Sequence, residues 1–196
     1  MMSVAKVFLV LASCLSLSVG QQRALQTVRE IDFSAYLGRW YQTHANLYST
    51  QTFEKDGFCN TATYGLYPNN TISVLNKQTL GGPTGPLDVI YGYAFVPDLY
   101  DPGKLLVDLQ TGFNDVAPYW IVKLGPKELQ ADGTYQYQYS IVTDNLSAFL
   151  FVLARDVEEF RQEYQDEVLL WLNENGFTRP LNKPVESYQR SDCVYD

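Results

Sequence analysis

Cysteine and histidine are scarce in this chain, which has three cysteines and a single histidine among 196 residues. Without a Cys-x-x-Cys pair or a His-Glu-x-x-His motif, the sequence predicts no metal site. Basic residues are scarce as well, because 14 lysines and arginines are outnumbered by 22 aspartates and glutamates, which gives a net charge of −8. Nucleic acids and anionic membranes are bound through clustered positive charge, so neither is expected as a partner.

Long hydrophobic runs are also lacking, and the one apolar stretch, residues 7–19, is too short to span a bilayer. Lys6 precedes this stretch, and the small residue Gly20 closes it at the position of a cleavage site. This arrangement is typical of a secretory signal peptide. We therefore predict that residues 1–20 are removed and that residues 21–196 form a single secreted domain.

Two alternatives remain for the N-terminus. Residues 11–14, Leu-Ala-Ser-Cys, resemble a bacterial lipoprotein box, in which Cys14 would carry a lipid anchor. The apolar residues Leu15, Leu17 and Val19 after that cysteine favour the ordinary signal peptide. The other alternative is a buried N-terminal helix.

Aromatic residues are abundant, with 15 tyrosines, 10 phenylalanines and 3 tryptophans. They recur in short alternating segments between turn residues, and no linker or low-complexity segment divides the chain after residue 24. Consecutive segments with hairpin-sized gaps predict an all-β fold, either an eight-stranded antiparallel up-and-down barrel or a sandwich. The expected strands cover residues 38–47, 59–67, 71–80, 87–97, 104–110, 119–124, 135–144 and 148–156.

Residues 157–175 change to a helical period, with apolar side chains every three or four residues between charged ones. Asp156 is a candidate cap at the start, and Gly176 fits the stop. A single helix cannot form a layer of its own, so we expect it to pack on the outside of the barrel. Its apolar stripe consists of Phe160, Tyr164, Val168 and Trp171.

Alternation along the strands places Trp40 and Arg155 on inward faces at one end of the barrel. The same alternation puts Gln42 and His44 on the face of Trp40. Gly38, just before the tryptophan, permits a tight turn or a close approach of another segment. A guanidinium over an indole is a cation–π contact worth roughly 0.5–2 kcal/mol. We therefore predict that Arg155 covers Trp40 and that the pair, with Gly38, closes the narrow end.

Removal of the leader would leave Cys59 and Cys193 as the cysteines of the mature chain. An even pair in a secreted protein implies a disulfide, which here would join an early strand to the C-terminus. Asn69 and Asn145 begin Asn-x-Thr and Asn-x-Ser sequons at expected turns. Both are candidate glycosylation sites.

Five collinear segments resemble the lipocalin family, and most closely its apolipoprotein D and bacterial outer-membrane branch. They are residues 36–41 (Tyr-Leu-Gly-Arg-Trp-Tyr), 59–64 (Cys-Asn-Thr-Ala-Thr-Tyr), 72–76 (Ile-Ser-Val-Leu-Asn), 118–121 (Pro-Tyr-Trp-Ile) and 152–155 (Val-Leu-Ala-Arg). The resemblance implies an eight-stranded calyx that is closed at the Trp40 end and open at the other. It also implies a C-terminal helix and a bridge between Cys59 and Cys193.

The second family motif, a Thr-Asp-Tyr run between the sixth and seventh strands, is not intact in this chain. Residues 124–135 form a longer loop there, and Thr143-Asp144 lies one hairpin later. The closed-end hydrogen bonds and any receptor contact of that motif are therefore not carried over.

The resemblance implies a carrier that sequesters a small hydrophobic ligand: a fatty acid or other lipid product, or a bilin, carotenoid or other pigment. His44 and Asn76 would be the polar groups that orient it. Simple core packing is the alternative role for each aromatic residue of the wall. By matched position and strand parity, the candidate wall residues are Tyr64, Asn76, Trp120, Tyr137, Tyr139, Phe149 and Phe151. A cell-surface receptor or a membrane lipid source is a further expected partner, no cofactor is expected, and the oligomeric state stays open.

The alternative function is a lipid-modifying enzyme of the isomerase type that uses the same cavity. It would need a free nucleophile or a paired acid and base in the calyx, and the sequence offers no catalytic candidate. The cysteines of the mature chain are expected to pair, and no serine lies in a Gly-x-Ser-x-Gly elbow. His44 could ligate haem iron, but it is more simply explained as a partly buried polar residue.

Overall fold

The computed structural model describes residues 25–69, 71–110 and 116–195, so the predicted leader and Cys14 lie outside the described residues. The strands are β1 (Gly38–Asn46), β2 (Gly57–Leu66), β3 (Ile72–Leu80), β4 (Leu87–Phe95), β5 (Lys104–Asp108), β6 (Ala117–Leu124), β7 (Lys127–Leu129), β8 (Tyr135–Tyr137), β9 (Tyr139–Thr143), β10 (Leu150–Ala154) and β11 (Pro184–Glu186). The helices are α1 (Phe33–Tyr36), α2 (Leu47–Gln51), α3 (Val157–Glu159), the π-helical turn η1 (Phe160–Tyr164) and α4 (Gln165–Glu174).

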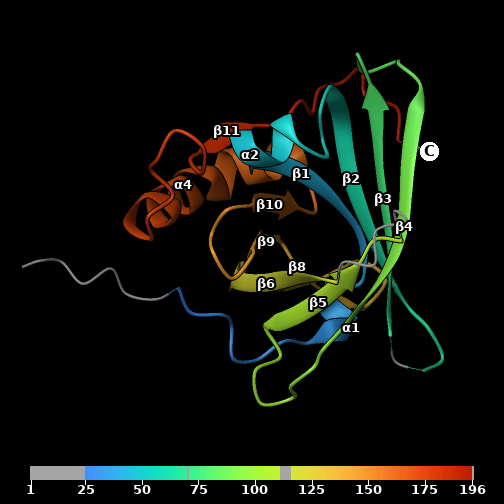
Figure 1. Ribbon diagram of the computed structural model, residues 1–196. Coiled ribbons are helices and arrows are strands. Elements are labelled where there is room, and N and C mark those ends of the chain that lie inside the picture. The colour runs from blue at the N-terminus through green and yellow to red at the C-terminus, as the bar shows by residue number, and fades with distance from the viewer. Residues whose placement is uncertain (1–24, 70, 111–115, 196) are drawn as a thin grey trace, which may run out of the picture.

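The main sheet closes on itself to form an eight-stranded antiparallel barrel (Figure 1). Its strand order is β10-β9-β6-β5-β4-β3-β2-β1, and β1 pairs with β10 to complete the ring. β11 pairs with the last residues of β1, while β7 and β8 form a separate hairpin. The barrel prediction is thus confirmed, because every predicted strand segment contributes a strand to the ring and the sandwich alternative is excluded.

The helix predicted at residues 157–175 is confirmed as the continuous run α3–η1–α4, which lies outside the barrel (Figure 1). Asp156 caps its start by accepting a hydrogen bond of 2.8 Å from the backbone N–H of Glu159. Phe160, Val168 and Leu172 are fully buried against the outward side chains of β9 and β10. The barrel therefore has two apolar layers, one inside it and one between its outer surface and this helix.

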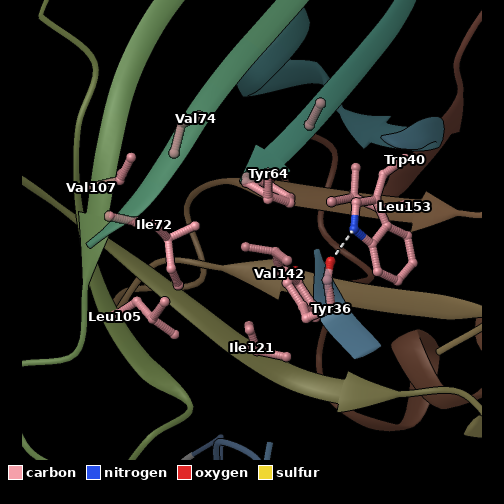
Figure 2. Packing of buried hydrophobic residues seen from close by; sticks show 12 residues of the cluster. Tyr36, Trp40, Tyr64, Ile72, Val74, Leu105, Val107, Ile121, Val142 and Leu153 are labelled. Atoms are coloured by element: carbon pink, nitrogen blue, oxygen red, sulfur yellow. Dashed lines mark hydrogen bonds between the residues drawn. The ribbon is translucent and has the colours of Figure 1, made fainter. Parts of the chain in front are cut away.

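The inner layer is one cluster of buried residues that includes the indole of Trp40 (Figure 2). Trp40 is fully buried, and its Nε1–H donates a 2.8 Å hydrogen bond to the backbone oxygen of Tyr36. The guanidinium carbon of Arg155 lies 3.7 Å from the centroid of the indole. This is the contact that strand alternation predicts for Arg155 and Trp40.

Arg155 also binds the backbone that leads from α1 into β1. Its Nη2 donates to the carbonyl oxygens of Ala35, Tyr36 and Leu37 at 3.0, 3.1 and 2.7 Å. Its Nη1 donates to the carbonyl oxygen of Arg39 at 2.7 Å. Carbonyl groups at the end of a helix lack partners within that helix, and the charged guanidinium supplies hydrogen-bond donors to them.

Gly38 is required by this arrangement for two reasons. Its φ of +94° lies in the left-handed region, which glycine adopts without strain. A Cβ at this position would also lie 3.3 Å from Nη1 of Arg155. A larger residue would therefore strain the turn and crowd the guanidinium.

The segment that lacks the second family motif makes contacts of its own at the closed end. It folds into the β7–β8 hairpin, from which Lys127 forms a 3.0 Å ion pair with Asp32, the N-cap of α1. The backbone N–H of Asp32 donates to the hydroxyl of Tyr137 at 3.0 Å. Hydrogen bonds from Ser34 and Lys127 lower the pKa of Asp32 to about 2, so this carboxylate is ionised at neutral pH.

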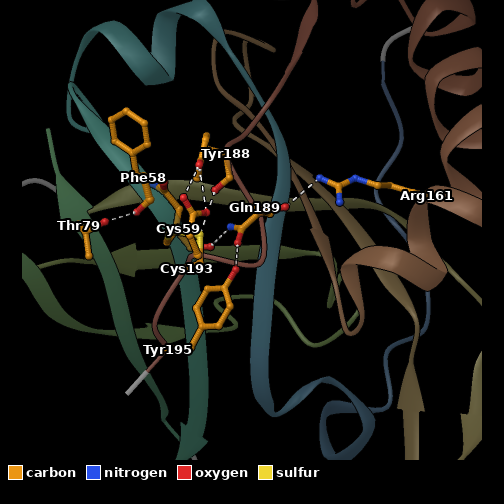
Figure 3. Close-up of a disulfide and its surroundings, with 10 residues drawn as sticks. Phe58, Cys59, Thr79, Arg161, Tyr188, Gln189, Cys193 and Tyr195 are labelled. Carbon is orange, nitrogen blue, oxygen red and sulfur yellow. Dashed lines mark hydrogen bonds between the residues drawn. A yellow bond between two sulfur atoms is a disulfide. The ribbon is translucent and has the colours of Figure 1, made fainter. Parts of the chain in front are cut away.

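The predicted disulfide joins Cys59 in β2 to Cys193 near the C-terminus, across a sequence separation of 134 (Figure 3). Closing a loop of that length contributes about 3–5 kcal/mol in the chain-entropy model. The same C-terminal segment is held by Gln189, whose Nε2 donates to the Asn60 carbonyl at 2.7 Å. Nη2 of Arg161 in turn donates to the Gln189 carbonyl at 3.0 Å, which ties the outer helix to this segment.

Replacing the indole at the closed end tests this packing. Trp40→Ala should lower the free energy of unfolding by about 3–5 kcal/mol, because it empties a fully buried site. Trp171→Ala, on the partly exposed surface of α4, is the matched control and should cost less. Urea denaturation measures both variants, and equal losses would contradict the closing role of Trp40.

Candidate functional site

A cavity of about 510 Å³ occupies the barrel between the closed end and the loops at the opposite end. It begins beside Tyr64 and Tyr119, above the closing indole, and extends to Phe53 and Phe149 in the opposite loops. Its apolar lining consists of Phe53, Ala62, Tyr64, Val74, Ile90, Val107, Leu109, Ala117, Pro118, Tyr119, Val142, Phe149, Phe151 and Leu153. Its polar lining consists of Gln42, Glu54, Asn60, Thr61, Asn76, Lys77, Gln78, Asp88, Thr143 and Asp144.

Linked tyrosines form the inner end of the cavity. The Tyr119 hydroxyl lies 2.8 Å from that of Tyr64 and 2.9 Å from that of Tyr36, which is 3.1 Å from Oγ of Ser140. Burial raises the pKa of Tyr36 to about 12 and also raises the pKa values of Tyr64 and Tyr119 well above their usual range. The phenols are therefore neutral at physiological pH, and this end of the cavity offers hydrogen bonds without a charge.

Phenylalanine rings gather at the outer end of the cavity. The ring centroid of Phe53 lies 5.3 Å from that of Phe149 and 5.9 Å from that of Phe151. Tyr48 of α2 packs on Phe149 from outside the cavity, with ring centroids 5.0 Å apart. The rings come from β10, the loop before it and the loop after α2, so segments distant in sequence form one aromatic wall.

Polar side chains line the wall formed by β1 to β4. Nε2 of Gln42 donates to Glu54 at 3.0 Å, and Nε2 of Gln78 donates to Asp88 at 2.8 Å. Nδ2 of Asn60 donates to Oε1 of Gln78 at 3.1 Å, which links β2 to this pair. Burial raises the pKa of Glu54 to about 7, so its carboxyl group titrates near neutral pH.

Four of the predicted wall residues do line the cavity: Tyr64, Asn76, Phe149 and Phe151. Their contact with a ligand stays a prediction. Trp120, Tyr137, Tyr139 and His44 do not line it, so their predicted positions are wrong and need a physical explanation.

Trp120 points outward, because the strand phase is displaced by one residue from the prediction. Its ring packs with the layer under the outer helix, and Nζ of Lys104 lies 4.9 Å from its ring centroid. Tyr119 takes the inward position instead. Tyr119, Trp120 and Ile121 are all large and apolar, so alternation alone cannot tell which of them faces inward.

The tyrosines of residues 135–139 do not share one face, because the strand bends at Gln138 between β8 and β9. Tyr137 packs against the closed end below the cavity. Tyr139 faces the outer helix, where its hydroxyl donates to Glu167 at 3.0 Å.

His44 faces outward because β1 contains a bulge. Gln42 pairs with Leu153 and His44 with the next residue, Val152, so Thr43 is an extra residue that reverses the alternation. Gln42 remains in the cavity wall, whereas the His44 ring lies 6.1 Å from that of Phe160 under the helix. Burial lowers the pKa of His44 to about 4.

Sequence reasoning missed Phe53 and Glu54, which lie in the loop after α2 and line the cavity. Loops have no hydrophobic period, so no pattern in residues 47–56 predicts that Phe53 and Glu54 point into the cavity. Gln42 lies in the cavity wall, on the inward face where strand alternation places it.

The chain matches the family model of the lipocalin domain over residues 22–193, and it belongs to the lipocalin family. It is 25% identical over 173 residues to temperature-induced lipocalin-1 from Arabidopsis thaliana, which covers 85% of this chain and 86% of that protein. It is 40% identical over 91 residues to apolipoprotein D from Rattus norvegicus. That match spans 46% of this chain and 44% of the rat protein, which is less than half of either.

Solved structures share the fold. Lobster apocrustacyanin A1 superposes with a TM-score of 0.57 at 17% identity, covering 83% of this chain and 82% of that one. A biogenic amine-binding protein superposes with a TM-score of 0.55 at 18% identity, covering 88% and 90%. At these low sequence identities, the two superpositions show a shared fold and nothing more.

In residues 25–69, 71–110 and 116–195, no group of three or more histidine, cysteine, aspartate or glutamate side chains is placed to hold a metal ion. No helix in the same ranges is long and apolar enough to cross a membrane.

The buried His44 predicts a pH-dependent stability. Its pKa is about 4 in the folded chain and 6.5 when unperturbed, so the unfolded chain binds the proton more tightly. The contribution of the neutral His44 to the free energy of unfolding is fully present above pH 6.5. It is lost as the pH falls towards 4, by roughly 3 kcal/mol in total. Urea denaturation measures the free energy of unfolding between pH 7 and pH 4, and His44→Gln should lose less of it over this interval than the unmodified protein does. The same pH profile in both proteins would contradict the buried, neutral imidazole.

Proposed function

We propose that this protein is a secreted carrier that sequesters a small hydrophobic ligand in the barrel and releases it unchanged. The cavity is the observation that carries this proposal. Its volume of about 510 Å³ falls in the range of roughly 300–1,000 Å³ that is typical of small-molecule sites. Burial of apolar ligand surface against such a wall contributes about 25 cal/mol per Å², which suffices for binding without a covalent step.

The wall chemistry suits a ligand with an extended apolar or conjugated body. Phe149, Phe151 and Phe53 offer ring faces for stacking, and the neutral phenols of Tyr64 and Tyr119 accept or donate hydrogen bonds at the inner end. A fatty acid, another lipid product, a bilin or another pigment fits that general description. Asn76 is the predicted polar residue that remains in position to orient the ligand, since His44 lies outside the cavity.

Secretion is part of the proposal. Residues 1–20 would be removed as a signal peptide and residues 21–196 would form the mature domain, with a lipid anchor at Cys14 as the alternative for a bacterial protein. The Cys59–Cys193 disulfide supports this, because such bonds persist in oxidising compartments. Asn69 and Asn145 are exposed in turns and accessible to glycosylation.

The loops at the outer end of the barrel are the proposed contact for a cell-surface receptor or a membrane lipid source. The isomerase alternative gains no support from the thiols of the described chain, because Cys59 and Cys193 are joined to each other.

Filling the cavity tests the carrier proposal. Ile90 lines the cavity on β4 and Val89, its neighbour, does not, because successive residues of a strand face opposite sides. Ile90→Trp should weaken binding of N-phenyl-1-naphthylamine, an uncharged fluorescent probe, at least tenfold, since the indole would take the ligand's place. Val89→Trp is the matched control and should bind as the unmodified protein does. Equal binding by all three proteins, or no binding of any apolar probe, would overturn the proposal.

A further inference from the structure

We propose that the calyx selects ligands with a cationic head, an alkylammonium group held between the Glu54 carboxylate and the phenylalanine rings at the outer end of the cavity. The inference rests on the proposed carrier function and specifies the chemical class of its ligand. It rests on the distribution of charge in the cavity and on the position of the rings relative to it.

The charged groups that line the cavity are mainly acidic. Within the described residues they are Glu54, Asp88 and Asp144, with Lys77 as the one cation. An anionic head would meet net repulsion there, whereas a cationic head would meet net attraction. Because the Glu54 side chain is partly buried, these charge interactions are stronger than they would be in water.

The three carboxylates differ in what they already bind. Asp144 accepts from the backbone N–H groups of Ala148 and Phe149 at 2.6 and 3.0 Å, so it is committed to its own loop. Asp88 accepts from Gln78 within the wall. Glu54 interacts with the neutral amides of Gln42 and Asn60, and no cationic partner balances its charge among its described contacts. An incoming ammonium group would supply that balance.

The aromatic wall supplies the second part of the site. Phe53 directly precedes Glu54 in the chain, and its ring packs on Phe149 and Phe151 with centroid separations of 5.3 and 5.9 Å. Ring faces attract alkylammonium groups through the cation–π interaction, which strengthens as water is excluded. Carboxylate and rings line one cavity, so one head group can contact both while its tail extends towards Tyr64 and Tyr119.

This geometry has a consequence for pH. The charged groups that face the cavity around Glu54 are Asp88 on β4, Lys77 on β3 and Asp144 after β9. Burial raises the pKa of Glu54 to about 7, so its carboxylate form is largely present at pH 8 and largely absent at pH 6. A bound cation stabilises the carboxylate, and affinity for the cation therefore rises with pH across this interval.

Three probes with the same tail separate head-group choice from general hydrophobic binding: decyltrimethylammonium, decanol and decanoate. Isothermal titration calorimetry at pH 8, below the micellar concentration of each probe, should give the cation at least tenfold higher affinity than decanoate. The quaternary ammonium does not titrate, so its affinity should fall by up to roughly tenfold from pH 8 to pH 6. Glu54→Gln should lose the preference and the pH dependence but still bind decanol. Glu174→Gln, which removes an exposed charge at the end of α4, is the matched control and should keep both.

The outcomes distinguish the two proposals. If decanol and N-phenyl-1-naphthylamine bind but decanoate binds as tightly as the cation, the carrier function stands and the cationic head is wrong. If the preference persists in Glu54→Gln, the assignment to Glu54 is wrong. If no probe binds, the carrier function itself fails. Should Glu54→Gln not fold, the pH dependence in the unmodified protein decides, and a constant cation affinity from pH 6 to pH 8 overturns the inference.

Discussion

The contact of Arg155 with Trp40 and with the carbonyl groups around α1 closes one end of the barrel, and the position of the cavity depends on that closure. One guanidinium covers the indole at 3.7 Å and joins the end of β10 to the start of β1, the two strands that close the ring. Its other donors bind the carbonyls of α1, so the short helix is held across the same end. With this end filled by side chains and backbone, an internal cavity can extend only towards the opposite loops.

The two faces of the barrel wall serve different purposes. Outward residues such as Tyr139 and Val152 are buried by the helix that packs on them, which makes that side of the barrel stable without using its interior. Inward residues near the closed end pack on Trp40. Farther from that end the inward side chains no longer meet across the barrel, and the space between Tyr64 and Phe149 is the cavity. The outer helix and the C-terminal disulfide therefore stabilise a barrel whose interior remains available to a ligand.

The elements were predictable where local chemistry determines them. Turn residues at regular intervals mark the strands, the capping by Asp156 marks the helix, and alternation is unbroken from Gly38 to Trp40, so the closing contact with Arg155 could be inferred. Alternation failed where pairing with another strand interrupts it, at the Thr43 bulge and at the Gln138 bend. Neither interruption has a signal in its own residues, because a bulge is set by the register of the partner strand.

Besides the ambiguous strand phase at Trp120, the loops and short elements were a further source of error. α1 and α2 are too short to show a helical period. The loop after α2 turns Phe53 and Glu54 into the cavity, and no periodic pattern in the sequence predicts that orientation. The cavity wall was therefore predicted in part, with its aromatic residues Phe149 and Phe151, while its carboxylates Glu54, Asp88 and Asp144 were missed. The family resemblance favoured the barrel over the sandwich and agreed with closure at Trp40, but the charge inside the cavity is a property of this chain's own residues.

The position of a bound ligand tests most directly whether the cavity above the closed end is the binding site. Intermolecular nuclear Overhauser effects between N-phenyl-1-naphthylamine and the isotopically labelled protein report protons that lie close together. A cavity closed by Trp40 and Arg155 predicts contacts to the rings of Phe149, Phe151 and Tyr64, and none to the indole of Trp40 beneath them. Contacts confined to Trp120 or Trp171 on the outer surface would contradict binding inside the cavity. A ligand in contact with the Trp40 indole would contradict the closure of the barrel at that end.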